Sequence, residues 1–340
     1  MSLIKTLSLA ALATTTSFGL FACGGDDGGG GGGGGIDDVD PAGTHTQYVV
    51  NSLLVPANAT QSANVAQDLD GDGVEDNALG GLLGALGSTA GLDLQTSVDE
   101  QLDAGSFILL ASIKATGLTN ANNVGTFVFF GENPTPAACT DPLDQNTCGK
   151  HLNGSASFEI AANSPTDALM VGTLAGGGLT AGPGTVSIEL PLGDEAIQLD
   201  LIAAHIDVTV TADGLTSGKL GGAITEEDVD NKLMPAVQSL IAGLITDDCT
   251  PVGGVNCGCV DGSSGSQVLD FFDTNNDCMV PLEELNSNSL IDATIRNPDL
   301  DLLDASGAFN PNSDGVNDSL SIGVGFSAVG ATFALPAGIE

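Results

Sequence analysis

The stretch AIQLDLIAAHIDVTV, residues 196–210, alternates apolar and polar side chains over most of its length. The apolar positions before and after its central break are Ile197, Leu199, Leu201, Ile206, Val208 and Val210. Successive side chains of a β-strand point to opposite faces, so this period of two predicts strands with one buried face. The pattern is typical of antiparallel sheets, because parallel strands are usually buried on both faces.

Similar runs occur on both sides of this stretch. They are residues 48–55, 107–113, 127–130, 156–160, 186–190 and 320–326. Turns rich in Gly or Asn, such as residues 176–178, separate the runs. Two packed sheets are an economical way to bury so many short strands. The sequence therefore predicts a mainly β (α+β) fold with an antiparallel β-sandwich-like body.

Helical patterns interrupt the strands. Residues 82–86 and 94–102 are expected to be helical. Thr225 is a good N-cap for an amphipathic helix over residues 225–245, in which Pro235 would introduce a kink. We therefore predict a helical insert over residues 225–300. The β body would then consist of residues 45–224, completed by C-terminal strands in residues 301–340.

The segment DTNNDCMVPLEE, residues 273–284, lies within the predicted insert and places oxygen atoms at the spacing of a calcium loop. The expected ligands are the side chains of Asp273, Asn275, Asp277 and Glu284 and the backbone carbonyl of Met279. With Glu284 bidentate, the set approaches the six to eight oxygens that Ca²⁺ prefers. It suits Ca²⁺ better than Mg²⁺, which demands a stricter octahedron.

This loop resembles an EF-hand, with residues 267–272 and 285–295 as the flanking helices. Two positions depart from the EF-hand pattern. Cys278 stands at position six, where the sharp turn usually requires Gly, and Pro281 offers no side-chain ligand at position nine. An acidic helix-turn-helix without a metal is the alternative interpretation.

Two other segments repeat parts of the same spacing. In the first, the expected ligands are Asp68, Asp70, Asp72, the carbonyl of Val74, and Asp76. It resembles the DxDxDG loops of dockerins and thrombospondin repeats. Its twelfth position is Leu79, so a closing carboxylate would come from elsewhere. In the second, the expected ligands are Asn310, Asn312, Asp314 and Asp318. Ordinary acidic or Asn-rich turns are the alternatives for both segments.

The first residues have the character of an export signal. Lys5 precedes a short apolar run within residues 1–22, and the run is too short to span a membrane. The string LFAC, residues 20–23, resembles a bacterial lipobox, which implies a diacylglycerol group on Cys23 and an acyl chain such as palmitate on its amino group. Residues 23–44 would form a Gly-rich tether. An ordinary secretory signal with an incidental Cys23 is the alternative.

Sorting rules of enterobacterial lipoproteins add a location. Asp directly after the lipidated Cys favours retention in the inner membrane, and Gly24 occupies that position here. The resemblance therefore implies the outer membrane, reached through the lipid on Cys23. It does not specify whether the periplasmic or the surface face is occupied.

Six further cysteines follow Cys23: Cys139, Cys148, Cys249, Cys257, Cys259 and Cys278. An even number of cysteines in an exported chain predicts disulfide bonds. Cys139 and Cys148 bracket a polar loop and are expected to pair. Cys257 and Cys259 are too close to favour each other, so Cys278 is expected to pair with one of the other three. A zinc cluster is the alternative for these four, although their spacing fits it poorly.

The balance of charge excludes some partners. The chain has 6 Lys and Arg against 44 Asp and Glu, a formal net charge of −38, which repels nucleic acids and anionic lipid surfaces. Its three histidines are isolated in sequence, and no nucleophile motif or phosphate loop accompanies them. A carboxylate pair of the glycosidase kind could hide among the acidic residues. We nevertheless predict no enzyme, no catalytic residue and no organic cofactor.

Together these observations predict a lipid-anchored calcium-binding protein of the cell envelope, in which calcium is mainly structural. The alternative is a module that recognises a glycan or a protein in the presence of calcium.

Overall fold

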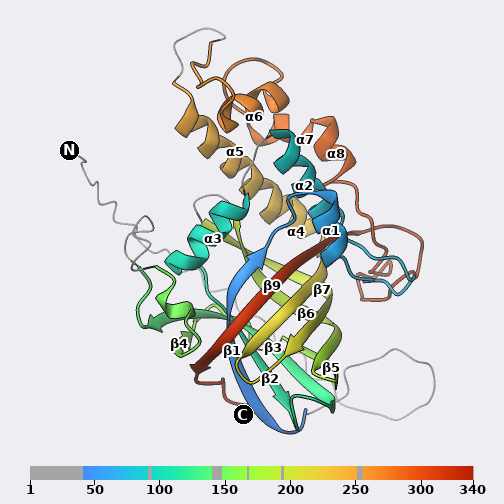
Figure 1. The fold of residues 1–340 in the computed structure, drawn as a ribbon. Coiled ribbons are helices and arrows are strands. Elements are labelled where there is room, and N and C mark those ends of the chain that lie inside the picture. Colours follow the sequence, from blue (N-terminus) through green and yellow to red (C-terminus); the bar gives the residue numbers. More distant parts are fainter. Residues whose placement is uncertain are drawn as a thin grey trace, which may run out of the picture. The chain divides into compact units, whose positions relative to one another are not determined.

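The computed structural model describes residues 41–90, 94–139, 148–166, 168–192, 195–250 and 256–339 (Figure 1). These residues belong to one compact unit, Val39–Glu340. The predicted signal, Cys23 and nearly all of the Gly-rich tether lie outside the described residues.

Eight antiparallel strands close into a barrel. Around the ring they are β1 (Thr44–Leu54), β2 (Leu109–Ala115), β3 (Ala121–Thr135), β5 (Leu169–Ala175), β6 (Gly178–Leu192), β7 (Glu195–Val210), β8 (Gly214–Thr225) and β9 (Ser319–Phe333). The ring closes because β1 pairs with β9 as well as with β2, and β3 pairs with β5 as well as with β2. The short β4 (Ala156–Ile160) pairs with β3 and, in parallel, with β9.

The antiparallel, mainly β prediction is confirmed, but a β-sandwich is wrong. Two separate sheets would leave edge strands, whereas each strand of this ring has a partner on both sides. Long, bent strands make the closure possible. β7 runs for 16 residues, with a register shift between Ile202 and His205 and a positive φ of 49° at Ala203. Such irregularities increase the twist and bend of a strand.

Two strands, β5 and β8, escaped the sequence prediction. In β8, four glycines interrupt the alternation of side chains: Gly214, Gly218, Gly221 and Gly222. The missing side chains allow close packing, since a Cβ at Gly222 would lie 2.8 Å from the Cβ of Leu201. More than one strand was expected in residues 301–340. The described part of this segment contains a single strand, β9.

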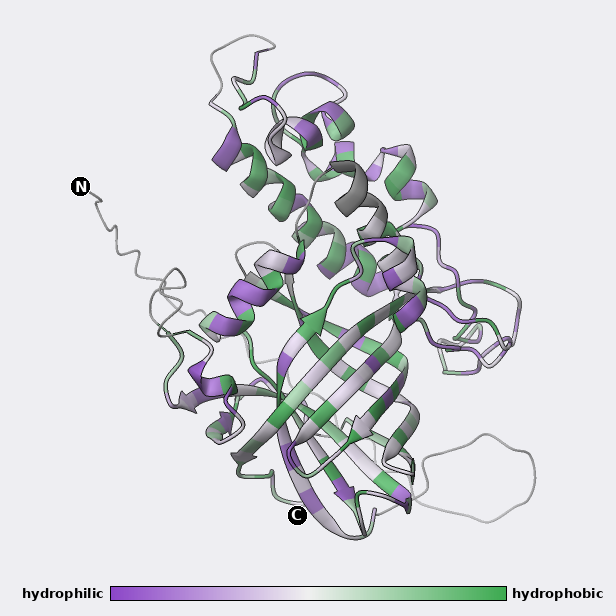
Figure 2. Cartoon of the chain, in the orientation of Figure 1, coloured by the Kyte–Doolittle hydropathy of each residue, from purple (hydrophilic) through white to green (hydrophobic). Residues whose placement is uncertain are grey.

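The barrel interior and the helices share one apolar core. It includes Tyr48 and Leu201 from the strands, Leu79 from α2 (Ala78–Ala90), Leu102 from α3 (Leu94–Ala104) and Ile241 from α5 (Met234–Asp248). Figure 2 shows apolar residues along the strands and on α5. Burial of each large apolar side chain stabilises the folded state by about 1.5–3 kcal/mol. This shared core therefore holds the helices against one end of the barrel (Figure 1).

The helix predicted over residues 225–245 is present in three parts. They are α4 (Glu226–Asp228), the π-helical η2 (Val229–Leu233) and α5. The side chain of Thr225 caps the first part, accepting a hydrogen bond from the Asp228 backbone N–H. Pro235 follows the π-turn, which is consistent with its missing N–H donor. Two other short helices are α1 (Ala59–Val65), which follows β1, and η1 (Lys150–Leu152), which precedes β4.

The helix expected over residues 285–295 is wrong as a single element. The structure has α7 (Leu282–Asn286) and then α8 (Ser289–Ala293). Asn288 separates them, because its side chain caps α8 by accepting from the Leu290 N–H. The incoming helix, α6 (Ser264–Phe272), is present as expected. No helix in the described part of the chain is long and apolar enough to cross a membrane.

The disulfide prediction is confirmed. Cys139 pairs with Cys148, and Cys278 pairs with Cys257. The third bond joins Cys249 to Cys259. Their sulfur atoms are thus committed to disulfides rather than to a zinc cluster.

Candidate metal centre

The loop 273–284 is held at both ends by the core. Phe272 ends α6 and is 1% exposed, while Val280 and Leu285 anchor the start of α7. Between these anchors, Asp273, Asp277 and Glu284 bring carboxylate oxygens within 4.8 Å of one another. Three of the five predicted ligands therefore converge in the structure.

Hydrogen bonds fold the loop around this cluster. Asp273 accepts from the Asp277 N–H at 3.2 Å and from the Cys278 N–H at 2.9 Å. Asp277 accepts from the Met279 N–H at 3.0 Å. Cys278 has a φ of 68°, so position six makes the left-handed turn even though it is not Gly.

Glu284 closes the loop from the buried side. It is 6% exposed, and its Oε1 accepts from the Thr274 N–H at 2.7 Å, the Asn275 N–H at 3.1 Å and the Thr274 hydroxyl. No described residue donates a hydrogen bond to its Oε2, which is also buried. A buried carboxylate oxygen without a partner costs free energy. A cation between Glu284 and the two aspartates would satisfy it.

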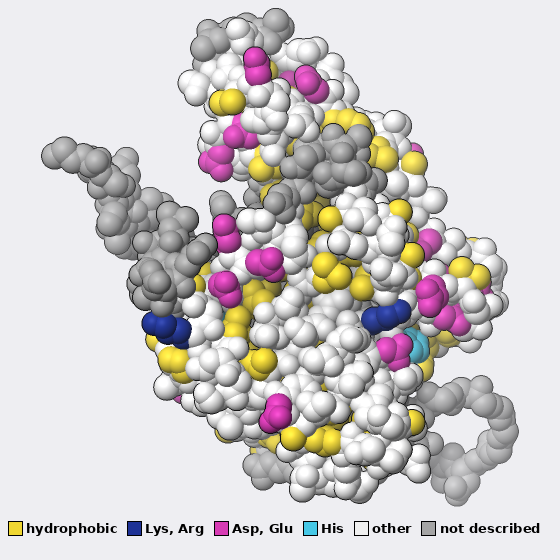
Figure 3. All heavy atoms as spheres, viewed as in Figure 1, with side chains coloured by type: hydrophobic (Ala, Val, Ile, Leu, Met, Phe, Trp, Pro, Cys, Tyr) yellow, Lys and Arg dark blue, Asp and Glu magenta, His cyan; other side chains and the backbone are white. Residues whose placement is uncertain are grey.

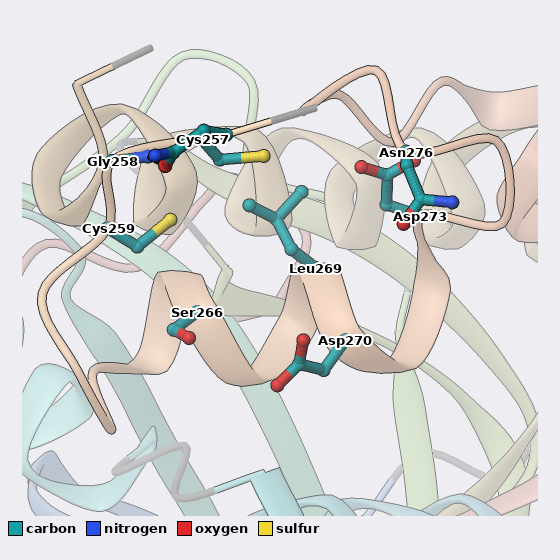
Figure 4. Close-up of a pocket in the computed structure, with 9 residues that line it drawn as sticks. Cys257, Gly258, Cys259, Ser266, Leu269, Asp270, Asp273 and Asn276 are labelled. Atoms are coloured by element: carbon teal, nitrogen blue, oxygen red, sulfur yellow. Dashed lines mark hydrogen bonds between the residues drawn. The ribbon is translucent and has the colours of Figure 1, made fainter. Parts of the chain in front are cut away.

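The Cys257–Cys278 disulfide ties this loop to the segment before α6. A cavity of about 400 Å³ lies between the two, with α6 along one side. Figure 4 shows Asp273 and Asn276 at one end of the cavity and Cys257 and Cys259 at the other. The loop is thus both fixed in position and open to water on the side of Asp273.

The loop 68–76 has the same turns. Asp68 accepts from the Gly71 N–H at 2.8 Å and from the Gly73 N–H at 3.1 Å. Asp76 reaches back to accept from the N–H of residue 69 at 3.0 Å. Oxygens of Asp68, Asp70 and Asp76 lie within 4.8 Å of one another. The side chain of Asp76, at position nine, therefore closes this loop in the place that Glu284 takes at position twelve.

Burial raises the pKa of Asp76 to about 6, and repulsion from Asp70, Asp299 and Asp72 acts in the same direction. The backbone N–H of residue 69 opposes the shift by stabilising the charged form. The charged form of the Asp76 carboxylate is therefore less stable here than in water, and a bound divalent cation would stabilise it.

The predicted ligands of residues 310–318 are less closely grouped. Asp314 accepts from the Val316 N–H at 2.9 Å, while Asn310 lies exposed. The sequence analysis missed Asp301, which is 5% exposed and accepts from the Gly315 N–H at 2.6 Å. Its distance in sequence from the loop conceals this contact.

The histidines make separate contacts. His45 bonds Ser112 and the Ile339 carbonyl, and His205 bonds the Ala203 carbonyl. His151 lies edge-on to Phe158, and burial lowers its pKa. The face shown in Figure 3 carries many acidic side chains and few basic ones, in keeping with the composition.

In comparisons with known proteins, no family model, no curated protein and no solved structure matches the chain.

Proposed function

We propose that this protein is a lipid-anchored calcium-binding protein of the bacterial cell envelope, in which calcium is mainly structural. The observation that carries the proposal is the buried, unpartnered Oε2 of Glu284, which lies in a cluster with Asp273 and Asp277. The ligands are all oxygens, and the loop spacing resembles an EF-hand, both of which favour Ca²⁺.

A structural role follows from where the loop is attached. Glu284 lies in α7, Asp273 directly follows α6, and Cys278 carries a disulfide. One ion bound to these residues would join the end of α6 to the start of α7. Binding to the folded state alone would stabilise it by about 2.7 kcal/mol at a hundredfold excess of calcium over Kd.

The anchor is proposed from the lipobox-like residues 20–23 and the glycines that follow. Cys23→Ser should abolish incorporation of labelled fatty acid and release the protein from membranes. A wild-type protein that takes up no fatty acid, and a Ser variant that still fractionates with membranes, would contradict the anchor while leaving the calcium sites unaffected.

Isothermal titration of the full chain with calcium, after treatment with chelator, tests the metal. We expect saturable binding with a Kd of about 10⁻⁴–10⁻³ M or tighter, as in other exported modules, and weaker binding of Mg²⁺. The absence of any binding heat at several concentrations of protein would refute the proposal. The recognition role predicts in addition a glycan or protein ligand that is retained only with calcium.

A further inference from the structure

Asp301 shares an unusual property with Glu284. Among the described carboxylates, only these two have a buried oxygen that no described residue contacts by a hydrogen bond. Asp301 is 5% exposed, and its unpartnered atom is Oδ1. The other oxygen, Oδ2, accepts from the backbone N–H groups of Asp314 at 3.3 Å and Gly315 at 2.6 Å.

These two contacts are those of the first residue in a calcium loop. Asp273, at position one of its loop, accepts from the N–H groups at positions five and six. Asp68 likewise accepts from position six, Gly73. The residue at position six has a positive φ in each case: 68° at Cys278, 88° at Gly73 and 74° at Gly315. Asp301 therefore occupies position one of a loop whose positions five and six are Asp314 and Gly315.

The closing carboxylate is also in the equivalent place. Asp318 accepts from the N–H of Leu302 at 3.4 Å and of Leu303 at 2.9 Å, which are the two residues after Asp301. Glu284 likewise accepts from the N–H groups of the two residues after Asp273, but both donate to its Oε1. In Asp318 the two contacts are divided between Oδ1 and Oδ2, and Oδ1 also accepts from the Ser319 hydroxyl at 2.6 Å. The Asp318 N–H also donates to the carbonyl of the residue before Asp301 at 2.8 Å, as Asp76 does to the residue before Asp68.

Position seven completes the comparison. Asp314 accepts from the Val316 N–H, as the aspartates at position five do in the other two loops. The residue at position seven is apolar and exposed in all three: Val74 60%, Met279 62% and Val316 61%. Its N–H is used by the turn in each loop, and its carbonyl was predicted as a ligand for Val74 and Met279 but not for Val316.

We propose that Asp301 is the first ligand of an interrupted calcium loop, completed by Asp314, the carbonyl of Val316 and Asp318. The proposal rests on the calcium binding proposed above but concerns a separate ion. Asp314 follows Asp301 by 13 positions rather than the four of an unbroken loop, so the segment between Leu303 and Asp314 carries nine extra residues. Asn310, the first ligand expected from the linear spacing, is then not part of the site.

The interrupted loop lies beside the loop 68–76. Asn312 donates from its side chain to the Asp70 carbonyl at 3.0 Å, and the position-two residues Leu69 and Leu302 share a small apolar cluster. Among described residues, however, only the loops 68–76 and 273–284 bring three carboxylate oxygens within 4.8 Å. The interrupted loop is accordingly expected to bind calcium more weakly than the loop 273–284.

Counting bound ions tests the proposal. Equilibrium dialysis of the full chain against calcium should show one ion fewer per chain for Asp301→Asn than for wild type. Asn310→Ala should retain the full number. In chelator, Asp301→Asn should melt no lower than wild type, because a neutral amide replaces a buried charge and keeps one acceptor oxygen. In calcium it should melt lower than wild type.

Asp314→Asn provides a second variant if Asp301→Asn fails to fold. Asp314 is exposed, and Asn retains the acceptor for the Val316 N–H, so the fold should survive while one ion is lost. Unchanged ion counts in the folded variants, or loss of an ion in Asn310→Ala, would overturn the proposal. If wild type binds no calcium, the general proposal fails. If Glu284→Gln loses an ion and the Asp301 and Asp314 variants lose none, only the interrupted loop is refuted.

Discussion

The loops 68–76 and 273–284 follow the same ligand pattern with different means of support. The first has Gly73 at position six and the closer match in sequence. It is closed by Asp76, which is only partly buried and whose described contacts include a backbone N–H. The second has Cys278 at position six, yet it is closed by the buried Glu284 and held by a disulfide. Agreement with a motif and structural support for a bound ion are therefore separate properties.

The largest effect is expected from the disulfide that supports only the second loop. Replacing Cys257 by Ala and Cys278 by Gly removes the bond and keeps a residue suited to a φ of 68°. We expect the free energy of unfolding to fall by about 3 kcal/mol. Calcium affinity at the loop should also fall, because the loop is less fixed before binding.

Cys139→Ala with Cys148→Ala is the matched control, since that bond lies in a separate loop. It should lower the free energy of unfolding, measured by chemical denaturation, without changing the calcium affinity. Equal calcium affinities for the two double variants would show that the Cys257–Cys278 bond does not support the loop 273–284.

A smaller effect is expected at Asp76. Asp76→Asn removes a charge that burial and neighbouring carboxylates disfavour, so in chelator the variant should be as stable as wild type or more stable. In calcium it should lose part of the stabilisation by the ion, which is about 1.4 kcal/mol at a tenfold excess over Kd. Melting curves in both conditions measure the two changes. A loss of stability that is equal in chelator and calcium would contradict this role.

The smallest effect is expected in the barrel. Tyr48 is fully buried, and its hydroxyl donates to the Thr211 carbonyl at 2.7 Å. Tyr48→Phe should cost about 1 kcal/mol, and it should cost the same with calcium as with chelator. A calcium-dependent difference in urea unfolding would show that the barrel and the loops are energetically coupled.

The strands could be predicted from sequence where side chains alternate, as in residues 197–201, but their closure into a ring could not. Closure depends on which strands become neighbours, and the alternation of side chains is the same in a sandwich and in a barrel. β8 could not be predicted because its glycines interrupt the alternation of apolar and polar side chains. The lack of a side chain at Gly222 is also what permits close packing against Leu201.

In the metal loops, the ligands that could be predicted are those that lie within one continuous segment of the sequence. The convergence of Asp273, Asp277 and Glu284 follows from their spacing in one segment. Asp301 could not be found in this way, because an insertion separates it from Asp314. The same reasoning applies to the disulfides: Cys139–Cys148 was predictable from proximity, whereas the partner of Cys278 depended on the fold.

The most direct measurement is the rise in melting temperature from chelator to several millimolar calcium, in wild type and in the matched variants Glu284→Gln and Glu283→Gln. Both substitutions remove one charge from the first turn of α7, but only Glu284 lies in the carboxylate cluster, while Glu283 is exposed. We predict that Glu284→Gln loses part of the rise and that Glu283→Gln keeps it. A wild type that melts at the same temperature in calcium and chelator, or two variants that lose the rise equally, would contradict calcium binding at this loop.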